Sequence, residues 1–198
     1  MAYEAEQIAV DGISIMQLDK MEIHCAPGGH GRCRLSGYVA ADSGEAVIYG
    51  MQENLPLKVS AGGSLIFSGL VTYARVSGMG GTYYVEAEGR TRSILMDQEQ
   101  HSRSFQDVNM TYKQLVKAIL SEYPEAEVSY SIPDVPIKEI AVQYRETDWQ
   151  FLKRMLSMLH APLACNPAGE TIQLYAGVPE IPYRDWGYEI TGFRKEMG

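Results

Sequence analysis

The chain has 198 residues, of which 45% are apolar and 21% charged, and its 17 basic and 25 acidic residues give a formal net charge of −8. The length suits one large domain or two small ones, and the composition is that of a folded protein. Because the chain is acidic and has no cluster of Lys and Arg, we expect it to bind neither nucleic acid nor an anionic membrane. Its apolar runs are only a few residues long, whereas a transmembrane helix needs roughly 18–20, so we expect no membrane partner.

The amino terminus and the cysteines indicate a reducing compartment. The first residues carry acid where a secretory signal carries base, and no apolar stretch follows them. We therefore expect the protein to be made and folded in a cytoplasm. Its three cysteines, Cys25, Cys33 and Cys165, are expected to remain reduced thiols.

Residues 1–102 are predicted to form a first, antiparallel β-barrel domain. Short strand-like runs alternate with Gly-rich turns, as in barrels and sandwiches. Residues 83–88 show the period-two pattern of a half-buried strand, and the loop 77–81 before them predicts a hairpin. The predicted strands cover residues 13–16, 21–26, 32–40, 55–60, 64–76 and 83–92.

A small α/β domain with two helices is predicted over residues 103–169. Apolar residues at helical spacing in residues 111–120 begin with a capping box formed by Thr111 and Gln114. The same pattern returns at Thr147 and Gln150, before a second apolar stripe that ends ahead of Pro162.

A strand and a connector are expected between these helices. Ile140, Val142 and Tyr144 alternate along the chain, which predicts a strand. Residues 129–136 contain two prolines and are expected to form a connector.

A hairpin is expected after the second helix. Residues 162–165 and 171–175 flank Asn166-Pro167-Ala168-Gly169, which has the residue choice of a type I turn. Residues 170–198 are predicted to begin a second β-barrel domain. The predicted fold class is therefore α+β.

The stretch richest in reactive groups, residues 24–33, holds two imidazoles and two thiols. Zinc sites commonly use Cys pairs two to four residues apart, but Cys25 and Cys33 lie further apart. His24 and Cys25 are neighbours on a predicted strand and would point to opposite faces. We favour a Gly-rich hairpin turn with buried thiols on its flanking strands. No helix follows residues 28–31 to hold a phosphate, so we predict no metal or phosphate site.

Other candidate catalytic groups have structural explanations that we favour. His160 and Cys165 would form a nucleophilic pair only if the fold joined them, and a helix end and a hairpin already explain both. Glu139, Glu146 and Asp148 offer carboxylates for glycoside cleavage, but Asp148 is expected in the first helical turn, where the dipole favours it. We predict no catalytic, cofactor-binding or metal-binding residues, and no enzyme.

The two tryptophans have different expected roles. Trp149 lies on the second predicted helix, where packing is favoured over ligand stacking. Trp186 lies in a polar, Pro-containing segment and is a candidate for a partner or glycan surface.

Residues 142–154 have the sequence VQYRETDWQFLKR. They fill every fixed position of V-Q-Y-x-E-[ST]-D-x-x-F-L-x-R, a run typical of the VgrG/late-control-D family, the baseplate hub proteins of contractile phage tails and related injection systems. Residues 104–120 resemble the family's aromatic-Gln segment and first helix, and residues 66–71 its F-x-G-x-V strand. The resemblance covers residues 55–176 in the same order, although the sequence His160-Ala161-Pro162-Leu163 departs from the acidic-Gly pattern that often follows.

This resemblance implies a structural role in assembly. Hub proteins of this family form trimers whose two similar barrels per subunit mimic six-fold symmetry, so that a hexameric tail tube joins a trimeric spike. We expect a homotrimer of the full-length protein that contacts tail tube and spike proteins. Its place would be a virion tail or phage-like particle assembled in the bacterial cytoplasm. Because the second barrel has hardly begun at Gly198, we expect a truncated or short member that forms no stable ring alone.

Two alternatives from other classes remain at this point. One is a phage tail-associated cell-wall hydrolase, which would need a paired-carboxylate or zinc motif. The other is a receptor- or glycan-binding module that uses Trp186 and the tyrosines. The parent device, whether phage, bacteriocin or secretion system, is left open.

Overall fold

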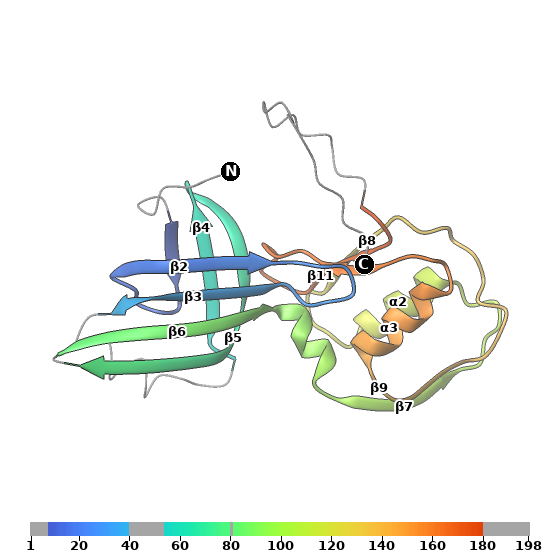
Figure 1. The fold of residues 1–198 in the computed structure, drawn as a ribbon. Helices are drawn as coiled ribbons and strands as arrows, with labels where there is room; N and C mark the ends of the chain where they lie inside the picture. The colour runs from blue at the N-terminus through green and yellow to red at the C-terminus, as the bar shows by residue number, and fades with distance from the viewer. Residues whose placement is uncertain (1–7, 40–53, 80, 180–198) are drawn as a thin grey trace, which may run out of the picture.

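The computed structural model of the chain describes residues 8–39, 54–79 and 81–179. They form a curled six-stranded sheet and, beside it, a smaller unit of helices and short strands (Figure 1). The broad α+β fold class is confirmed. None of the helices in these residues is long and apolar enough to cross a membrane.

The six-stranded sheet has the strand order β1-β4-β5-β6-β3-β2. All of its neighbouring pairs are antiparallel, and the sheet curls into half of a barrel, which we call the half-barrel (Figure 1). Its strands are β1 (Ile8–Asp11), β2 (Gln17–His24), β3 (Arg32–Val39), β4 (Pro56–Ala61), β5 (Ser64–Met79) and β6 (Thr82–Thr91).

The half-barrel buries one face of each strand because successive side chains point to opposite sides of the sheet. On β3 the residues Cys33 and Leu35 point inward, while Arg34 between them is exposed. The buried residues of this core are Ile13, Cys33, Leu35, Val39, Leu57, Val59, Phe67, Val85 and Ala87.

The predicted strand at residues 13–16 is wrong. These residues connect β1 to β2, and β1 itself was not predicted. Gly12 has φ of +101°, and a Cβ there would lie 2.0 Å from the carbonyl oxygen of Pro56. The chain therefore turns at a position that only glycine fits, and Ile13 enters the core from a turn.

The hairpin of β5 and β6 is confirmed, but its loop is shorter than residues 77–81. Ser77, Gly78 and Met79 pair with Tyr84, Tyr83 and Thr82 in the strand ladder. Pairing between β5 and β6 therefore extends β5 into the Gly-rich segment that was predicted to be a loop.

The smaller unit packs two helices against short strands. Its two sheets have the orders β10-β11-β8 and β7-β9, and the helices lie between these sheets (Figure 1). Its elements are η2 (Arg92–Asp97, a 3₁₀-helix), β7 (Gln100–Phe105), α2 (Tyr112–Leu120), β8 (Glu127–Tyr130), β9 (Ala141–Thr147), α3 (Asp148–Ser157), β10 (Leu163–Cys165) and β11 (Gln173–Ala176).

Both predicted helices begin at their capping boxes. The Thr111 hydroxyl accepts a hydrogen bond from the Gln114 N–H at 3.2 Å, and the Gln114 side chain accepts one from the Thr111 N–H at 2.9 Å. Thr147 and Gln150 make the same two bonds at 3.2 Å each. These bonds satisfy backbone donors that the first helical turn leaves unpaired.

The hairpin of β10 and β11 is also confirmed. The Gly169 N–H donates to the Asn166 carbonyl at 3.3 Å, the bond that commonly closes a type I turn. The Asn166 side chain also accepts a bond from the Ala168 N–H at 3.1 Å, which stabilises the turn locally.

The predicted connector at residues 129–136 is partly wrong. Ser129 and Tyr130 belong to β8, which pairs in parallel with β11 through Ser129–Tyr175 and Tyr130–Ala176. Parallel pairing between segments so far apart in the chain leaves no local pattern.

The predicted strand around Ile140, Val142 and Tyr144 is confirmed as β9, but its apolar side chains face outward. Ile140, Val142 and Tyr144 are 57%, 47% and 68% exposed. Ala141 and Gln143 take the inward positions. The alternation of apolar residues predicted the strand correctly, but these residues lie on the surface of the smaller unit and not in its core.

Candidate functional site

The family-like segment at residues 142–154 spans β9 and α3 and contains a fully buried carboxylate. Asp148 is 0% exposed. It accepts hydrogen bonds from the Arg103 guanidinium on β7, from the Tyr123 hydroxyl after α2 at 2.7 Å, and from the Gln143 side chain on β9 at 2.9 Å. One carboxylate in the first turn of α3 thus joins four parts of the unit.

The partners of Asp148 are themselves connected. The Arg103 Nε–H donates to the Gln143 side-chain oxygen at 2.8 Å, and the Gln143 amide also donates to the Glu146 carbonyl at 2.9 Å. Burial and then the hydrogen bond to Asp148 raise the pKa of Tyr123, so its hydroxyl remains a donor. A buried polar network of this kind specifies one arrangement of the surrounding strands and helices.

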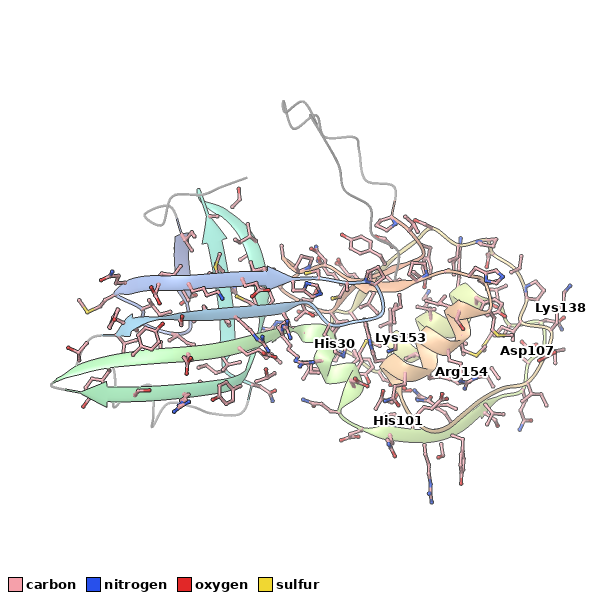
Figure 2. The ribbon with its side chains drawn as sticks, in the orientation of Figure 1. His30, His101, Asp107, Lys138, Lys153 and Arg154 are labelled. Atoms are coloured by element: carbon pink, nitrogen blue, oxygen red, sulfur yellow. The ribbon has the colours of Figure 1, made fainter. Side chains whose placement is uncertain are left out.

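A second polar contact holds β9 to α3. Arg154, which Figure 2 shows on α3, donates to both carboxylate oxygens of Glu146 at 2.8 and 2.6 Å, and to the Val142 carbonyl at 2.6 Å. The hydrogen bond from Arg154 lowers the pKa of Glu146, and the same bond raises the pKa of Arg154. The fixed polar positions of the motif therefore hold the unit together.

The β2–β3 loop, residues 25–31, connects the half-barrel to the smaller unit. The Gly28 N–H donates to the Leu163 carbonyl at 2.6 Å, and the Trp149 indole N–H donates to the Gly28 carbonyl at 3.3 Å. The His30 ring lies 4.3 Å from the Trp149 ring, centre to centre. Its Nε2 is 3.3 Å from an Asp97 oxygen, and Figure 2 shows His30 where the two parts meet.

The hairpin predicted for residues 24–33 is confirmed, with a correction to its thiols. Cys33 is fully buried as predicted, but Cys25 is exposed, because it lies beyond the end of β2. In the described part of the chain no three His, Cys, Asp or Glu residues are grouped so that they could hold a metal ion.

The Cys165–His160 pair, which the sequence did not favour, is not among the hydrogen-bond contacts of the thiol. Cys165 Sγ lies 3.2 Å from the Gly31 nitrogen and 3.3 Å from the Thr91 hydroxyl. His160 lies after α3 with φ of +52°.

The three candidate carboxylates have separate surroundings. Asp148 is in the first turn of α3, as predicted, and is occupied by Arg103 and Tyr123, while Glu146 is held by Arg154. Glu139 is exposed. Two of the three carboxylates are therefore engaged in holding the unit together.

The packing role predicted for Trp149 is confirmed, since its side chain is 1% exposed. Trp186 lies outside the described residues.

Two surfaces emerge that the sequence did not identify. The first lies over β2, β3 and β6 and holds a hollow of about 500 Å³. There Arg34 donates to Glu88 at 2.8 Å, and Lys20, Glu22 and Glu86 line the same hollow.

The second surface is the outward face of β9, with Val142 and Tyr144, together with Ile140 just before the strand. Both surfaces depend on which neighbours the strands pair with. Period-two patterns alone would have found the residues on one side of a strand, but they do not say which side is buried.

Solved structures with a similar fold include two tail proteins and a type VI secretion component. The 43 kDa tail protein of prophage MuSo2 from Shewanella oneidensis is 18% identical, with a TM-score of 0.69 over 86% of this chain and 53% of that protein. A tail protein from Neisseria meningitidis MC58 is 13% identical, with a TM-score of 0.64 over 93% of this chain and 52% of that one. The E. coli c3393 protein, a type VI secretion component similar in structure to the T4 tail proteins gp27 and gp5, is 17% identical, with a TM-score of 0.56 over 85% of this chain and 48% of that one. The chain therefore has a phage-tail fold and spans about half the length of these proteins.

A family model places the sequence more narrowly. The model described as phage tail baseplate hub (GPD) matches residues 45–158, which is more than half of the chain. The chain belongs to this family of structural tail proteins, which are not enzymes, and is a component of a phage tail or related secretion system. Among curated proteins, none matches the sequence significantly.

Proposed function

We propose that the chain is the part of a baseplate hub that joins a hexameric tail tube to a trimeric spike. The observation that carries this proposal is the open half-barrel in a chain of the hub family. Among the described residues β1 and β2 each pair with one strand only. A free strand edge offers backbone donors and acceptors to another chain, so the sheet is suited to continue into a neighbouring barrel.

In the proposed assembly the full-length protein is a homotrimer with two barrels per subunit. Residues 1–102 contain the first barrel of the ring, residues 103–169 most of the small α/β domain, and residues 170–198 the last strand of that domain, β11, followed by the beginning of a second β-domain. The pairing of β11 with β8 and β10 supports a firm connection between the last two parts. The particle is assembled in the bacterial cytoplasm, like the tube and spike proteins it contacts.

The charge of the chain suits a passage. A net charge of −8 disfavours tight binding of phosphate groups, so a conduit built from such subunits would not retain DNA or acidic effectors.

The test is the position and assembly of the protein in its own particle. Met16 is 75% exposed just before the edge strand β2, and Met158 is 66% exposed at the end of α3. We expect Met16→Arg in the full-length protein to reduce the number of assembled tails, because a charged side chain would enter the ring contact. Met158→Arg introduces the same change away from that edge and is the matched control.

Electron microscopy of the unmodified particles locates the protein. Density or antibody label at the junction of tube and spike supports the proposal. Label on fibres or on the outer sheath, or equal tail counts for both arginine variants, would contradict it.

A further inference from the structure

Two thiols from different parts of the molecule approach the same glycine. Cys165 Sγ on β10 lies 3.2 Å from the Gly31 nitrogen. Cys25 Sγ, from the start of the β2–β3 loop, lies 3.3 Å from the point where a Cβ on Gly31 would be. The half-barrel and the smaller unit each bring one sulfur to this place.

The missing side chain of Gly31 makes this approach possible. A Cβ there would also lie 2.7 Å from the Thr91 methyl group, closer than real side chains come. The Thr91 hydroxyl accepts from the Gly31 N–H at 3.1 Å and lies 3.3 Å from Cys165 Sγ. Gly31 is therefore needed for space, and both thiols lie beside it.

The strand register and one backbone hydrogen bond bring the segments of Cys25 and Cys165 to the same loop. The β2–β3 register ends with His24 opposite Arg32, and Cys25 and Gly31 are the next residues of the loop on either side. On the other side the Gly28 N–H donates to the Leu163 carbonyl at 2.6 Å, which holds β10 along the same loop. A disulfide needs Cα atoms within roughly 7 Å, and the contacts of both sulfurs with Gly31 place the two side chains beside one residue.

We propose that Cys25 and Cys165 form a disulfide when the folded protein meets an oxidised disulfide such as glutathione disulfide. The exposed Cys25 loses its proton, and its thiolate attacks one sulfur of the oxidant, which breaks the oxidant's S–S bond and releases one glutathione thiolate. The Cys165 thiolate then attacks the Cys25 sulfur and displaces the second glutathione. Two protein thiols are oxidised, one glutathione disulfide is reduced to two thiols, and the two protons pass to these products.

The third thiol is left out of this reaction by burial. Cys33 is 0% exposed in the core of the half-barrel, where an oxidant does not reach it. Burial raises the pKa of Cys33 to about 12, and it also raises the pKa of Cys25. Cys25 therefore reacts slowly at neutral pH and faster in alkali, because the thiolate is the attacking species.

The cross-link would change the junction between the two parts. It closes a loop of about 140 residues, and long loops gain most from closure in the chain-entropy description. It ties the β2–β3 loop to β10, so that the half-barrel and the smaller unit no longer separate when the protein partly unfolds. The chain in a reducing cytoplasm keeps this junction uncrosslinked.

The test uses the whole chain. The protein is incubated with glutathione disulfide at about pH 8.5; one part is used for the intact mass, and the rest is blocked with a maleimide in denaturant and digested for mass spectrometry. We expect the intact mass to fall by two hydrogen atoms, a Cys25–Cys165 peptide, and a free Cys33. We also expect the midpoint of thermal unfolding to rise by roughly 10 °C and to return on reduction.

Variants separate this proposal from other thiol chemistry. Cys25→Ser and Cys165→Ser are each expected to abolish the link, whereas Cys33→Ala retains it. Gly31→Ala is expected to slow it roughly tenfold by displacing Cys25 Sγ, with folding checked by circular dichroism. Gly29→Ala is the matched control, because a Cβ there meets only the Ala26 oxygen at 3.6 Å.

Several outcomes would overturn the proposal. These are a Cys25–Cys33 link, a stable glutathione adduct on Cys25 as the end product, a link between two chains, or three free thiols after oxidation.

Discussion

The half-barrel and the smaller unit are stabilised in different ways. The half-barrel encloses an apolar core and carries ion pairs such as Arg34–Glu88 on its surface, where Arg34 is 56% exposed. The smaller unit buries Asp148 and Gln143 completely among its helices and strands. Surface ion pairs contribute little, whereas a buried charge becomes costly once its partner is removed. The arrangement of the half-barrel therefore depends on register and apolar packing, and that of the smaller unit depends also on polar contacts.

The largest expected effect comes from removing the buried carboxylate. Asp148→Ala removes one of the acceptors of Arg103, one partner of the buried Gln143 and the acceptor of the Tyr123 hydroxyl. We expect a loss of about 3–5 kcal/mol in the free energy of unfolding, measured by urea denaturation. Glu139→Ala removes an exposed carboxylate and should change the value by less than about 0.5 kcal/mol. Similar losses in the two variants would show that the network does not stabilise the unit.

Matched core substitutions test whether the two parts unfold separately. Leu57 lies in the half-barrel core and Leu115 in the core of the smaller unit, and both are 0% exposed. Each Leu→Ala change is expected to cost about 2–5 kcal/mol, from lost burial and from the cavity left behind. Hydrogen exchange should accelerate mainly in the part that carries the substitution. Acceleration throughout the chain in both variants would show one cooperative unit.

The two helix caps provide a smaller and graded comparison. Both threonines accept a bond from the N3 backbone, but the Thr147 hydroxyl also donates to Asp97. We expect Thr111→Ala to cost about 1 kcal/mol and Thr147→Ala about 2 kcal/mol in thermal or urea unfolding. Equal costs for the two would mean that the bond to Asp97 contributes nothing.

The smallest effect concerns the exposed pair of Glu146 and Arg154. In the folded protein the hydrogen bond from Arg154 lowers the pKa of Glu146 from 4.5. At pH values between the folded and the unfolded pKa, the unfolded chain therefore binds more protons than the folded chain. The pair's contribution is present above pH 4.5 and is lost as the pH falls through the lowered folded pKa. Because solvent screens the pair, we expect about 0.5 kcal/mol or less. In Glu146→Gln the free energy of unfolding, measured by urea denaturation at a series of pH values, should fall less steeply below pH 4.5. The same fall in the variant and the unmodified protein would show that Glu146 does not contribute to it.

Local patterns predicted the elements whose signals lie within a few residues. Thr111 and Gln114 or Thr147 and Gln150 satisfy each other's backbone groups, so the start of each helix is written in adjacent residues. The turn at residues 166–169 is equally local. The family-like motif was visible because its polar positions are close together in the chain.

Other features escaped because their causes are distant in the chain. Strand β8 exists through its pairing with β11, and Ile13 is buried because Gly12 turns the chain beside Pro56. Arg103 had no signal as a partner of Asp148, since the two lie on different elements. Cys25 was expected to be buried because the predicted strand extended two residues beyond the end of β2.

The sequence by itself determined the two capped helices, the hairpins, the α+β class and the resemblance to tail hub proteins, because these depend on short-range hydrogen bonding and side-chain periodicity. Only the tertiary structure decided that Val142 and Tyr144 face solvent, and that Gln143 faces the buried Asp148. A period of two separates the faces of a strand, but the neighbours that pack against it determine which face is buried. Likewise, the composition counts three thiols, and only the packing of the β2–β3 loop on β10 brings Cys25 and Cys165 to one glycine.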